Sequence, residues 1–141
     1  MNEFNLNFYK GKKVLVTGHT GFKGTWLCRI LQELGAEVTG YSQKPPTDPS
    51  IFTLTDLESQ IHSVIGDIRD LEHMIQVFKE TQPEIVFHLA AQPIVRESYK
   101  NPVYTYETNV MGTVNILEAV RQCRSVKSFL NVTTDKVYRN N

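Results

Sequence analysis

Three glycines, Gly18, Gly21 and Gly24, follow an apolar run at intervals of three residues. A residue without a Cβ lets the backbone turn sharply, lets an anion reach main-chain N–H groups, and lets a helix pack closely on a strand. A helix that begins at such a turn also offers unpaired N–H groups and the positive end of its dipole to a phosphate. The spacing therefore predicts a turn that binds the pyrophosphate of a dinucleotide.

A nucleoside-triphosphate loop is the alternative phosphate site that glycines beside a lysine could form. That loop requires Gly-Lys-Ser/Thr after a four-residue gap. Here Lys23 precedes Gly24 instead of following it, so the sequence excludes this loop. A turn without a ligand stays open as the second interpretation, because three glycines alone are weak evidence of binding.

Two elements must position the glycine turn. Val14–Val16 is β-branched and aliphatic, as is typical of a strand buried on both faces. After the turn, apolar residues recur at three- and four-residue intervals and predict a helix that stops at Gly35. These residues are Trp26, Leu27, Ile30, Leu31 and Leu34.

Strands and helices alternate along the rest of the chain. Apolar runs predict strands at residues 36–41, 61–65, 84–89 and 126–132, and apolar faces predict helices from Leu71 and from Pro102. This alternation indicates an α/β fold, because parallel strands need helical crossovers. We predict a Rossmann-like, doubly wound parallel sheet of order 3-2-1-4-5 in one domain over residues 1–141, incomplete after the fifth strand and without a substrate domain.

Small and polar residues gather where the predicted strands end. Ligands of such sheets bind beyond the carboxyl ends of the strands, so these residues should share one edge. They are Thr17-Gly18, Tyr41-Ser42, Gly66-Asp67, Leu89-Ala90-Ala91 and Thr133-Thr134-Asp135.

The amino-acid composition argues against several classes of binding partner. Fifteen basic residues balance fifteen acidic ones, so we expect no nucleic acid and no membrane surface as a partner. No apolar run approaches the ~20 residues of a membrane span, and Met1–Asn5 lacks a leader pattern, which predicts a cytoplasmic protein. Cys28 and Cys123 lack metal-ligand spacing, so we expect reduced core thiols and no metal site.

With these motifs, the sequence resembles the extended short-chain dehydrogenases/reductases that act on nucleotide sugars, and among them the 4,6-dehydratases. The resemblance covers nearly the whole chain from Lys12 onward. It rests on the segments Thr17–Gly24, Gly66–Asp70, His88–Pro93, Thr108–Thr113 and Thr133–Tyr138.

The resemblance implies a site for NAD or NADP, with the glycine turn at the pyrophosphate, Asp67-Ile68 against adenine and Leu89–Ala91 on the nicotinamide side. The cofactor residues that it implies are Gly18, His19, Thr20, Gly21, Phe22, Gly24, Ser42, Asp67, Ile68, Leu89, Ala90 and Ala91. It also implies a homo-oligomer and a nucleotide-sugar substrate, CDP-glucose, in contact with Gln92 and Ser98.

The reaction that the resemblance implies is an internal redox cycle. Hydride leaves C4 of the glucose for the cofactor, water is eliminated across C5 and C6, and hydride returns to C6, which gives a 4-keto-6-deoxy sugar nucleotide. Such an elimination needs a base, an acid and a hydrogen bond at the C4 oxygen, which Thr134, Asp135 and Lys136 could supply. A polar strand end without a catalytic role is the alternative, because Asp and Lys are common on surfaces.

Three positions depart from the family pattern. Lys136 stands where related dTDP-glucose dehydratases have Glu, so the base for the C5 proton stays open. The second predicted strand ends in Tyr41-Ser42-Gln43-Lys44 without the carboxylate that would bind a ribose diol; with Ser42 and Lys44 there instead, we expect only a weak preference between NAD and NADP. The catalytic Tyr-x-x-x-Lys is absent after residue 126; the match at Tyr9–Lys13 precedes the first strand, so we predict that the chain alone is inactive.

Two other functions fit the same sequence. One is a nucleotide-sugar epimerase or reductase of the same family, and the other is a dinucleotide-binding module without catalysis. An acid such as Asp135 at the fifth strand favours the dehydratase over the epimerase.

Overall fold

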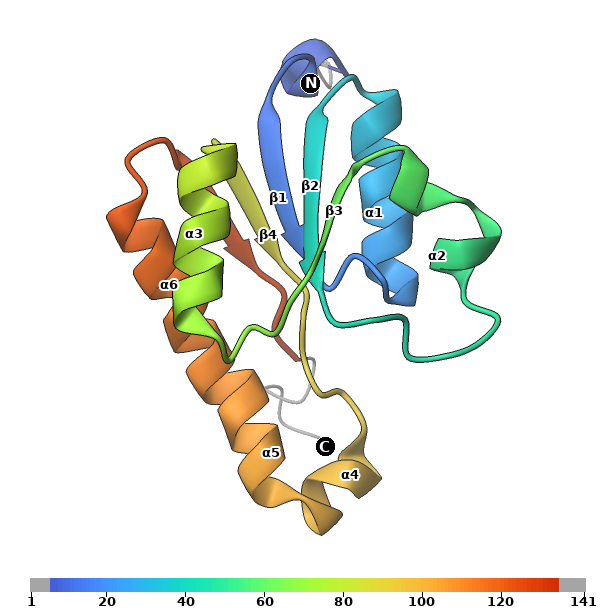
Figure 1. Ribbon diagram of the computed structural model, residues 1–141, viewed down its shortest axis with the longest axis vertical. Coiled ribbons are helices and arrows are strands. Elements are labelled where there is room, and N and C mark those ends of the chain that lie inside the picture. The colour runs from blue at the N-terminus through green and yellow to red at the C-terminus, as the bar shows by residue number, and fades with distance from the viewer. Residues whose placement is uncertain (1–5, 135–141) are drawn as a thin grey trace, which may run out of the picture.

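The computed structural model describes residues 6–134, which form a five-stranded parallel sheet of order β3-β2-β1-β4-β5 (Figure 1). The predicted architecture and strand order are confirmed. The strands are β1 (Lys13–Thr17), β2 (Glu37–Ser42), β3 (His62–Ile65), β4 (Ile85–His88) and β5 (Ser128–Asn131). Val14 is in register with Val38 of β2 and with Ile85 of β4, so β1 lies at the centre of the sheet.

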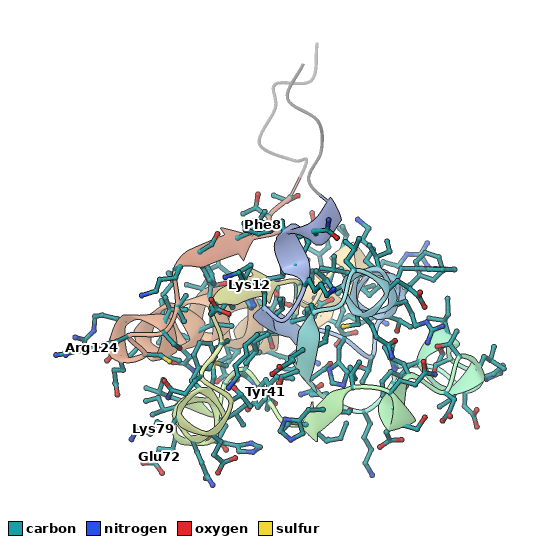
Figure 2. The ribbon with its side chains drawn as sticks, turned by 90° about the horizontal axis from the view of Figure 1, so that it is seen from above. Phe8, Lys12, Tyr41, Glu72, Lys79 and Arg124 are labelled. Carbon is teal, nitrogen blue, oxygen red and sulfur yellow. The ribbon has the colours of Figure 1, made fainter. Side chains whose placement is uncertain are left out.

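Helices cover both faces of the sheet. They are α1 (Phe22–Glu33), α2 (Ile51–Leu54), α3 (Leu71–Thr81), α4 (Val95–Lys100), α5 (Pro102–Tyr106) and α6 (Gly112–Gln122), with 3-10 turns η1 (Leu6–Tyr9) and η2 (Leu57–Ser59) and the π-helical turn η3 (Glu107–Met111). Figure 1 shows α1 and α2 on one side of the strands and α3 and α6 side by side on the other. The same division is visible along the strands in Figure 2, seen from the edge that carries Phe8 and Lys12.

The central strand explains the two layers of the core. Successive side chains of a strand point to opposite faces, so Leu15 packs under α3 and α6 whereas Val14 and Val16 pack under α1 and α2. All three side chains are buried. Residues Val14–Val16 are therefore all apolar because helices cover both faces of this strand, as the sequence predicted.

Local signals begin and end the helices that flank the site. Gly35 follows α1 at φ +80°, a left-handed conformation that a glycine adopts without strain. The side chain of Asp70 caps α3 by accepting the N–H of His73 at 3.0 Å. Gln82 ends α3 at φ +48°, and Pro83, which cannot continue a helix, follows.

The segment from Pro102 to Gln122 is helical, but its apolar stripe lies on the outer side. Thr108, Gly112, Ile116 and Ala119 face the core, and Gly112 leaves room for the side chain of Ile68. The predicted apolar face is instead largely exposed, at Val103, Tyr106, Val110, Val114 and Leu117. Periodicity thus predicted the helix but not the side that it buries.

Cys28 and Cys123 are buried and unpaired, as expected. Burial raises the pKa of the Cys28 thiol to about 12, so this thiol stays protonated. Among residues 6–134, no helix combines the length and the apolar character needed to cross a membrane. The described His, Cys, Asp and Glu side chains form no group of three that could hold a metal ion.

Candidate functional site at the carboxyl edge of the sheet

The glycine turn joins β1 to α1, and two of its glycines are required by the protein itself. Gly18 has φ +78°, and a Cβ there would lie 2.9 Å from the backbone nitrogen of Ala90. A Cβ on Gly24 would overlap the carbonyl oxygen of Gly18. These two glycines therefore fix a close approach between the start of α1 and the ends of β1 and β4.

Gly21 is different, because the protein around it has room for a side chain. Its φ is −81°, and a Cβ would meet, among the described atoms, only the oxygen of Gly18 at 3.4 Å, an ordinary contact. Gly21 is the N-cap of α1, and none of the described side chains caps this helix start. The N–H groups of the first turn are therefore open to an anion, and a small residue at Gly21 leaves the space in front of them free.

Hydroxyl groups tie the glycine turn to the end of β2. The Thr20 Oγ1 hydroxyl donates to the carbonyl oxygen of Gln43 at 2.9 Å and accepts from the Ser42 hydroxyl, also at 2.9 Å. Thr20 and Ser42 are buried. The two predicted cofactor residues thus hold the turn against β2, which fixes the backbone of Gln43.

The His19 side chain points into the core. Its Nε2 lies 2.8 Å from Ser63 Oγ, and its ring packs edge-on against Phe52. Burial lowers the pKa of His19 from 6.5 to about 4, so the ring is neutral at pH 7. Of this predicted cofactor residue, only the backbone belongs to the turn. Phe22, in contrast, begins α1 with a largely exposed ring.

The end of β4 is held by Thr17 at the end of β1. Its hydroxyl oxygen accepts the N–H groups of Leu89 and Ala90, each at 3.1 Å. A hydroxyl that accepts twice has one hydrogen left, and it points to Nδ1 of His88 at 2.7 Å. Leu89–Ala91, predicted on the nicotinamide side, is therefore anchored beside the glycine turn.

His88 links Thr17 to the helix layer through a chain of hydrogen bonds. Its Nδ1 accepts from Thr17, so Nε2 carries the proton and donates to Thr113 Oγ1 at 3.3 Å, which donates to the carbonyl oxygen of Asn109 at 2.7 Å. Asn109 in turn accepts the N–H of Gln92 at 2.7 Å and donates to its carbonyl oxygen at 3.0 Å. Burial lowers the pKa of His88 to about 4, which keeps the ring in the neutral form that this chain of hydrogen bonds requires.

The two predicted substrate residues have intramolecular partners. The Gln92 amide donates to Thr105 Oγ1 at 2.9 Å and accepts the N–H of Ile94 at 2.6 Å, and the residue is buried. This geometry indicates that Gln92 supports the loop before α4. The Ser98 hydroxyl donates to the carbonyl oxygen of Val95 at 2.6 Å within α4.

A pocket lies where β2, β3 and β4 end and α5 begins. It is lined by Ser42, Gln43, Gly66, Asp67, Ile68, Ala90, Ala91, Tyr104 and Thr108. Tyr41 supports the lining residues Gly66 and Asp67, since its hydroxyl donates to the carbonyl oxygen of Asp67 at 2.9 Å and its ring leaves no room for a Cβ on Gly66. The structure thus brings together five of the predicted cofactor residues, Ser42, Asp67, Ile68, Ala90 and Ala91.

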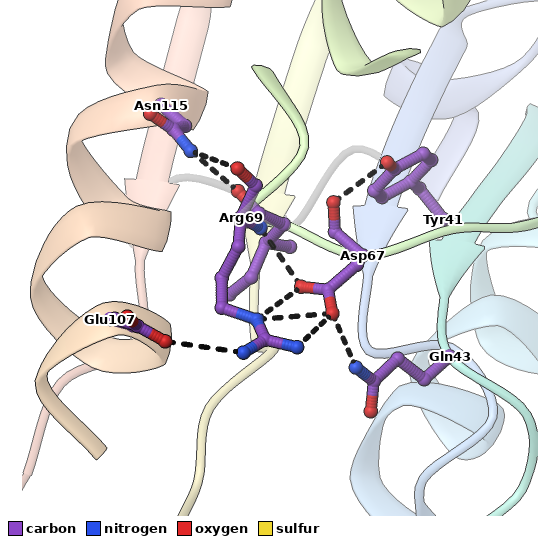
Figure 3. Close-up of polar contacts among 7 residues, drawn as sticks. Tyr41, Gln43, Asp67, Arg69, Glu107 and Asn115 are labelled. Carbon is purple, nitrogen blue, oxygen red and sulfur yellow. Dashed lines mark hydrogen bonds and ion pairs between the residues drawn. The ribbon is translucent and has the colours of Figure 1, made fainter. Parts of the chain in front are cut away.

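Asp67 is the centre of a polar cluster at this pocket (Figure 3). Arg69 pairs with its carboxylate, with Nη2 and Oδ2 2.6 Å apart, and Gln43 donates to the same Oδ2 at 2.7 Å. Arg69 also reaches Glu107 at 3.3 Å and lies over the ring of Tyr104. The guanidinium of Arg69 lowers the pKa of the Asp67 carboxyl, so the carboxylate is ionised at pH 7.

The proposed catalytic group lies at the limit of the described chain. Thr134 is exposed three residues after β5, on the edge where the other strands end. Asp135 and Lys136 lie outside the described residues. The Tyr9–Lys13 match precedes and enters β1, at the opposite edge of the sheet, so a catalytic role for it is excluded by position.

Sequence reasoning gave no role to Thr17, His88, Asn109, Thr113 or Arg69. All five lie within or beside the segments that carry the family resemblance, but their types alone do not reveal that they hold one another. The geometry as a whole offers open N–H groups at the start of α1, a pocket of mixed polar and apolar lining that includes Asp67, and a Leu89–Ala91 segment anchored beside the glycine turn. This arrangement suits an elongated ligand with a phosphate group at its centre.

Comparisons with known proteins agree with this geometry. Residues 15–140 match the profile of the family described as GDP-mannose 4,6 dehydratase. CDP-glucose 4,6-dehydratase of Salmonella typhimurium is 54% identical over 134 residues, which cover 95% of this chain and 37% of that protein. CDP-paratose 2-epimerase of Salmonella typhi is 36% identical over 129 residues, which cover 89% of this chain and 38% of that protein.

Among solved structures, UDP-glucose-4-epimerase of Stenotrophomonas maltophila with bound NAD has a TM-score of 0.81 at 28% identity, over 92% of this chain and 39% of that one. The chain spans less than two fifths of the length of each of these three proteins. The family match nevertheless runs from β1 through every strand end that forms the pocket, and so this chain belongs to the GDP-mannose 4,6 dehydratase family.

Proposed function

We propose that this chain binds NAD or NADP across the carboxyl edge of its sheet. The observation that carries the proposal is Gly21, whose backbone and surroundings would accept a side chain although a glycine is present. A glycine here keeps the space in front of the open N–H groups of α1 free, and a pyrophosphate on those groups fits that space. The adenine would lie at Asp67 and Ile68, and the nicotinamide beside Leu89–Ala91.

The glycine turn provides the experiment. Gly21→Val adds a branched side chain in front of the helix N-terminus, and we expect it to weaken binding of reduced cofactor at least tenfold in a fluorescence titration. Gly11→Asn is the matched control, because Gly11 has φ +71° with open space around it, and Asn tolerates that conformation. Equal affinity of wild type and Gly21→Val, or a folded wild type that binds neither cofactor, would refute the proposal.

We further propose that the chain is the cofactor-binding portion of a nucleotide-sugar 4,6-dehydratase that acts on CDP-glucose. The support is the 54% identity to the Salmonella typhimurium enzyme of that name. A bound nicotinamide would take hydride from C4 and return it to C6. Asp135 would protonate the departing hydroxyl, Thr134 would donate to the C4 oxygen, and Lys136 is the candidate base for the C5 proton.

A protein that joins this chain to the remaining length of its relatives would test the dehydratase proposal. Asp135→Asn should allow oxidation at C4 but slow elimination at least a hundredfold, because an amide fills the space without donating the proton. Rapid-mixing absorbance should then show reduced cofactor accumulating. An unchanged rate of 4-keto-6-deoxy product formation would remove Asp135 from the mechanism.

An epimerase is the second candidate, because the CDP-paratose and UDP-glucose epimerases match the same region. It would return hydride to C4 and release no water, so the product separates the two functions. We propose that the 141-residue chain by itself carries out neither reaction, since its single Tyr-x-x-x-Lys lies at Tyr9–Lys13. Product formation from CDP-glucose and NAD⁺ by this chain would contradict that.

A further inference from the structure

Gln43 occupies the position that decides between NAD and NADP in sheets of this kind. A carboxylate about 20 residues after the glycine turn binds the ribose 2′-hydroxyl of NAD, whereas a nearby arginine accommodates the 2′-phosphate of NADP. Gln43 follows β2 directly, lines the pocket with Ser42 and Asp67, and is held at its backbone by Thr20. Its amide could serve either cofactor, because one end accepts and the other donates.

The orientation of this amide is fixed by Asp67. The carboxylate is ionised, since Arg69 contacts both of its oxygens, and an ionised carboxylate can only accept hydrogen bonds. The atom of Gln43 that lies 2.7 Å from Oδ2 must therefore be the nitrogen. The amide oxygen then points away from Asp67, as Figure 3 shows.

Asp67 is itself immobilised by groups from two layers. Its Oδ1 accepts the backbone N–H of Arg69 at 2.9 Å, and its backbone oxygen accepts from Tyr41. Arg69 is held from the helix side by Glu107 and by the ring of Tyr104. A 180° rotation of the Gln43 amide would place its oxygen next to the Asp67 carboxylate. The two acceptors would repel each other, and the hydrogen bonds of Asp67 keep its carboxylate in place.

We propose that the Gln43 carbonyl accepts the 2′-hydroxyl of the adenosine ribose, in place of the missing carboxylate, and that Asp67 thereby makes the site prefer NAD over NADP. A hydroxyl can donate to this oxygen, whereas a 2′-phosphate offers mainly acceptors and meets the negative end of the amide dipole. One of the two amide hydrogens, which could have bound a phosphate, is already bonded to Asp67. Lys44 is exposed, so solvent and salt weaken its attraction for a phosphate. The inference rests on the proposed cofactor binding and replaces the weak preference expected from sequence.

The ratio of two dissociation constants measures the effect. NAD and NADP share the adenine, the pyrophosphate and the nicotinamide, so changes at those contacts cancel in the ratio. Calorimetric titration of the chain with each cofactor should give at least tenfold tighter binding of NAD, and Gln43→Ala should reduce that ratio at least fivefold. Gln76→Ala is the matched control, since Gln76 donates to the carboxylate of Glu80 on α3 away from the pocket.

Asp67→Asn tests whether the orientation of the amide is the cause. This variant should lower the NAD preference when Gln43 is present, because the amide can then rotate, and should leave the ratio unchanged in the Gln43→Ala background. A wild-type ratio below tenfold, an unchanged ratio in Gln43→Ala, or an equal effect of Asp67→Asn in both backgrounds would overturn the inference while cofactor binding itself stands. A folded wild type that binds neither cofactor would instead refute the proposed function and this inference with it.

Discussion

Two buried histidines hold the site as neutral hydrogen-bonding groups. His19 fastens the glycine turn to β3 through Ser63, and His88 fastens the end of β4 to α6 through Thr113. Burial lowers the pKa of both rings to about 4. Each ring must therefore lose a partner or gain a buried charge when it is protonated, which makes both positions sensitive to acid.

We expect acid to destabilise the chain in the range where unfolded histidine titrates. The unfolded side chain has a pKa near 6.5 and binds more protons than the folded one between pH 6.5 and 4, so the stabilisation is present above pH 6.5 and is lost as pH falls. Each histidine should lower the free energy of unfolding by about 2 kcal/mol between pH 7 and pH 5. Urea unfolding at several pH values measures this loss.

Substitutions identify the source of the pH dependence. His19→Gln and His88→Gln should each flatten the pH profile, because glutamine keeps polar atoms but does not titrate. A wild-type slope that persists in the His19→Gln, His88→Gln double variant would show that other groups cause it.

At the scale of elements, η3 connects the helix layer to the loop after β4. Asn109 lies in this π-helical turn and pairs with both the N–H and the carbonyl group of Gln92. The Asn109 side chain thus makes the same pair of hydrogen bonds to the Gln92 backbone that a residue of a neighbouring β-strand would make. It holds the loop that joins Ala90-Ala91 to α4, so η3 positions one wall of the pocket.

Asn109→Ala should destabilise the chain and loosen this loop. It leaves two half-buried backbone groups of Gln92 without a partner, and each unsatisfied group costs about 1–3 kcal/mol. We expect a lower urea midpoint and faster hydrogen exchange in residues 90–94. Asn101→Ala is the control, because the hydrogen bond from the Asn101 amide to the Glu97 carboxylate is exposed to solvent. Equal midpoints for the two variants would contradict a structural role for Asn109.

The elements themselves were largely predictable from sequence. The predicted strands at 36–41, 61–65 and 84–89 differ by at most one residue at each end from β2, β3 and β4, because apolar runs between turn residues leave few alternatives. The fifth strand is shorter than predicted, since Val126 and Lys127 lie between the turn at Arg124-Ser125 and the first residue of β5. Gly35 acted as the expected helix stop because its effect is local.

The site was predictable in outline only. Gly18, Gly24 and the pocket residues follow from strand ends in a parallel sheet, which is a matter of topology. The His19–Ser63 contact, the Gln92–Thr105 hydrogen bond and the Thr17–His88–Thr113 connection join residues that lie 13 to 71 positions apart along the chain. No pattern within one segment could reveal them.

At the scale of the whole molecule, large apolar side chains remain exposed on α1, α5, η3 and α6. Trp26 and Ile30 of α1 are each about half exposed, and Val103 and Tyr106 of α5 are each 69% exposed. Val110, Val114 and Leu117 continue the stripe of α5 along η3 and α6. Contiguous apolar patches on soluble domains commonly mark surfaces of association.

We therefore expect copies of this chain to associate through the α5–α6 stripe. Light scattering should give a mass above the 16.1 kDa of one chain that rises with concentration. Val110→Lys with Leu117→Lys should shift the chain toward the monomer, because two ammonium groups would have to be buried in any contact along the stripe. Gln122→Lys, at an exposed polar position of α6, serves as the control. A wild-type mass of one chain at all concentrations, or an association that the two lysines leave unchanged, would assign the stripe no role in contacts between copies.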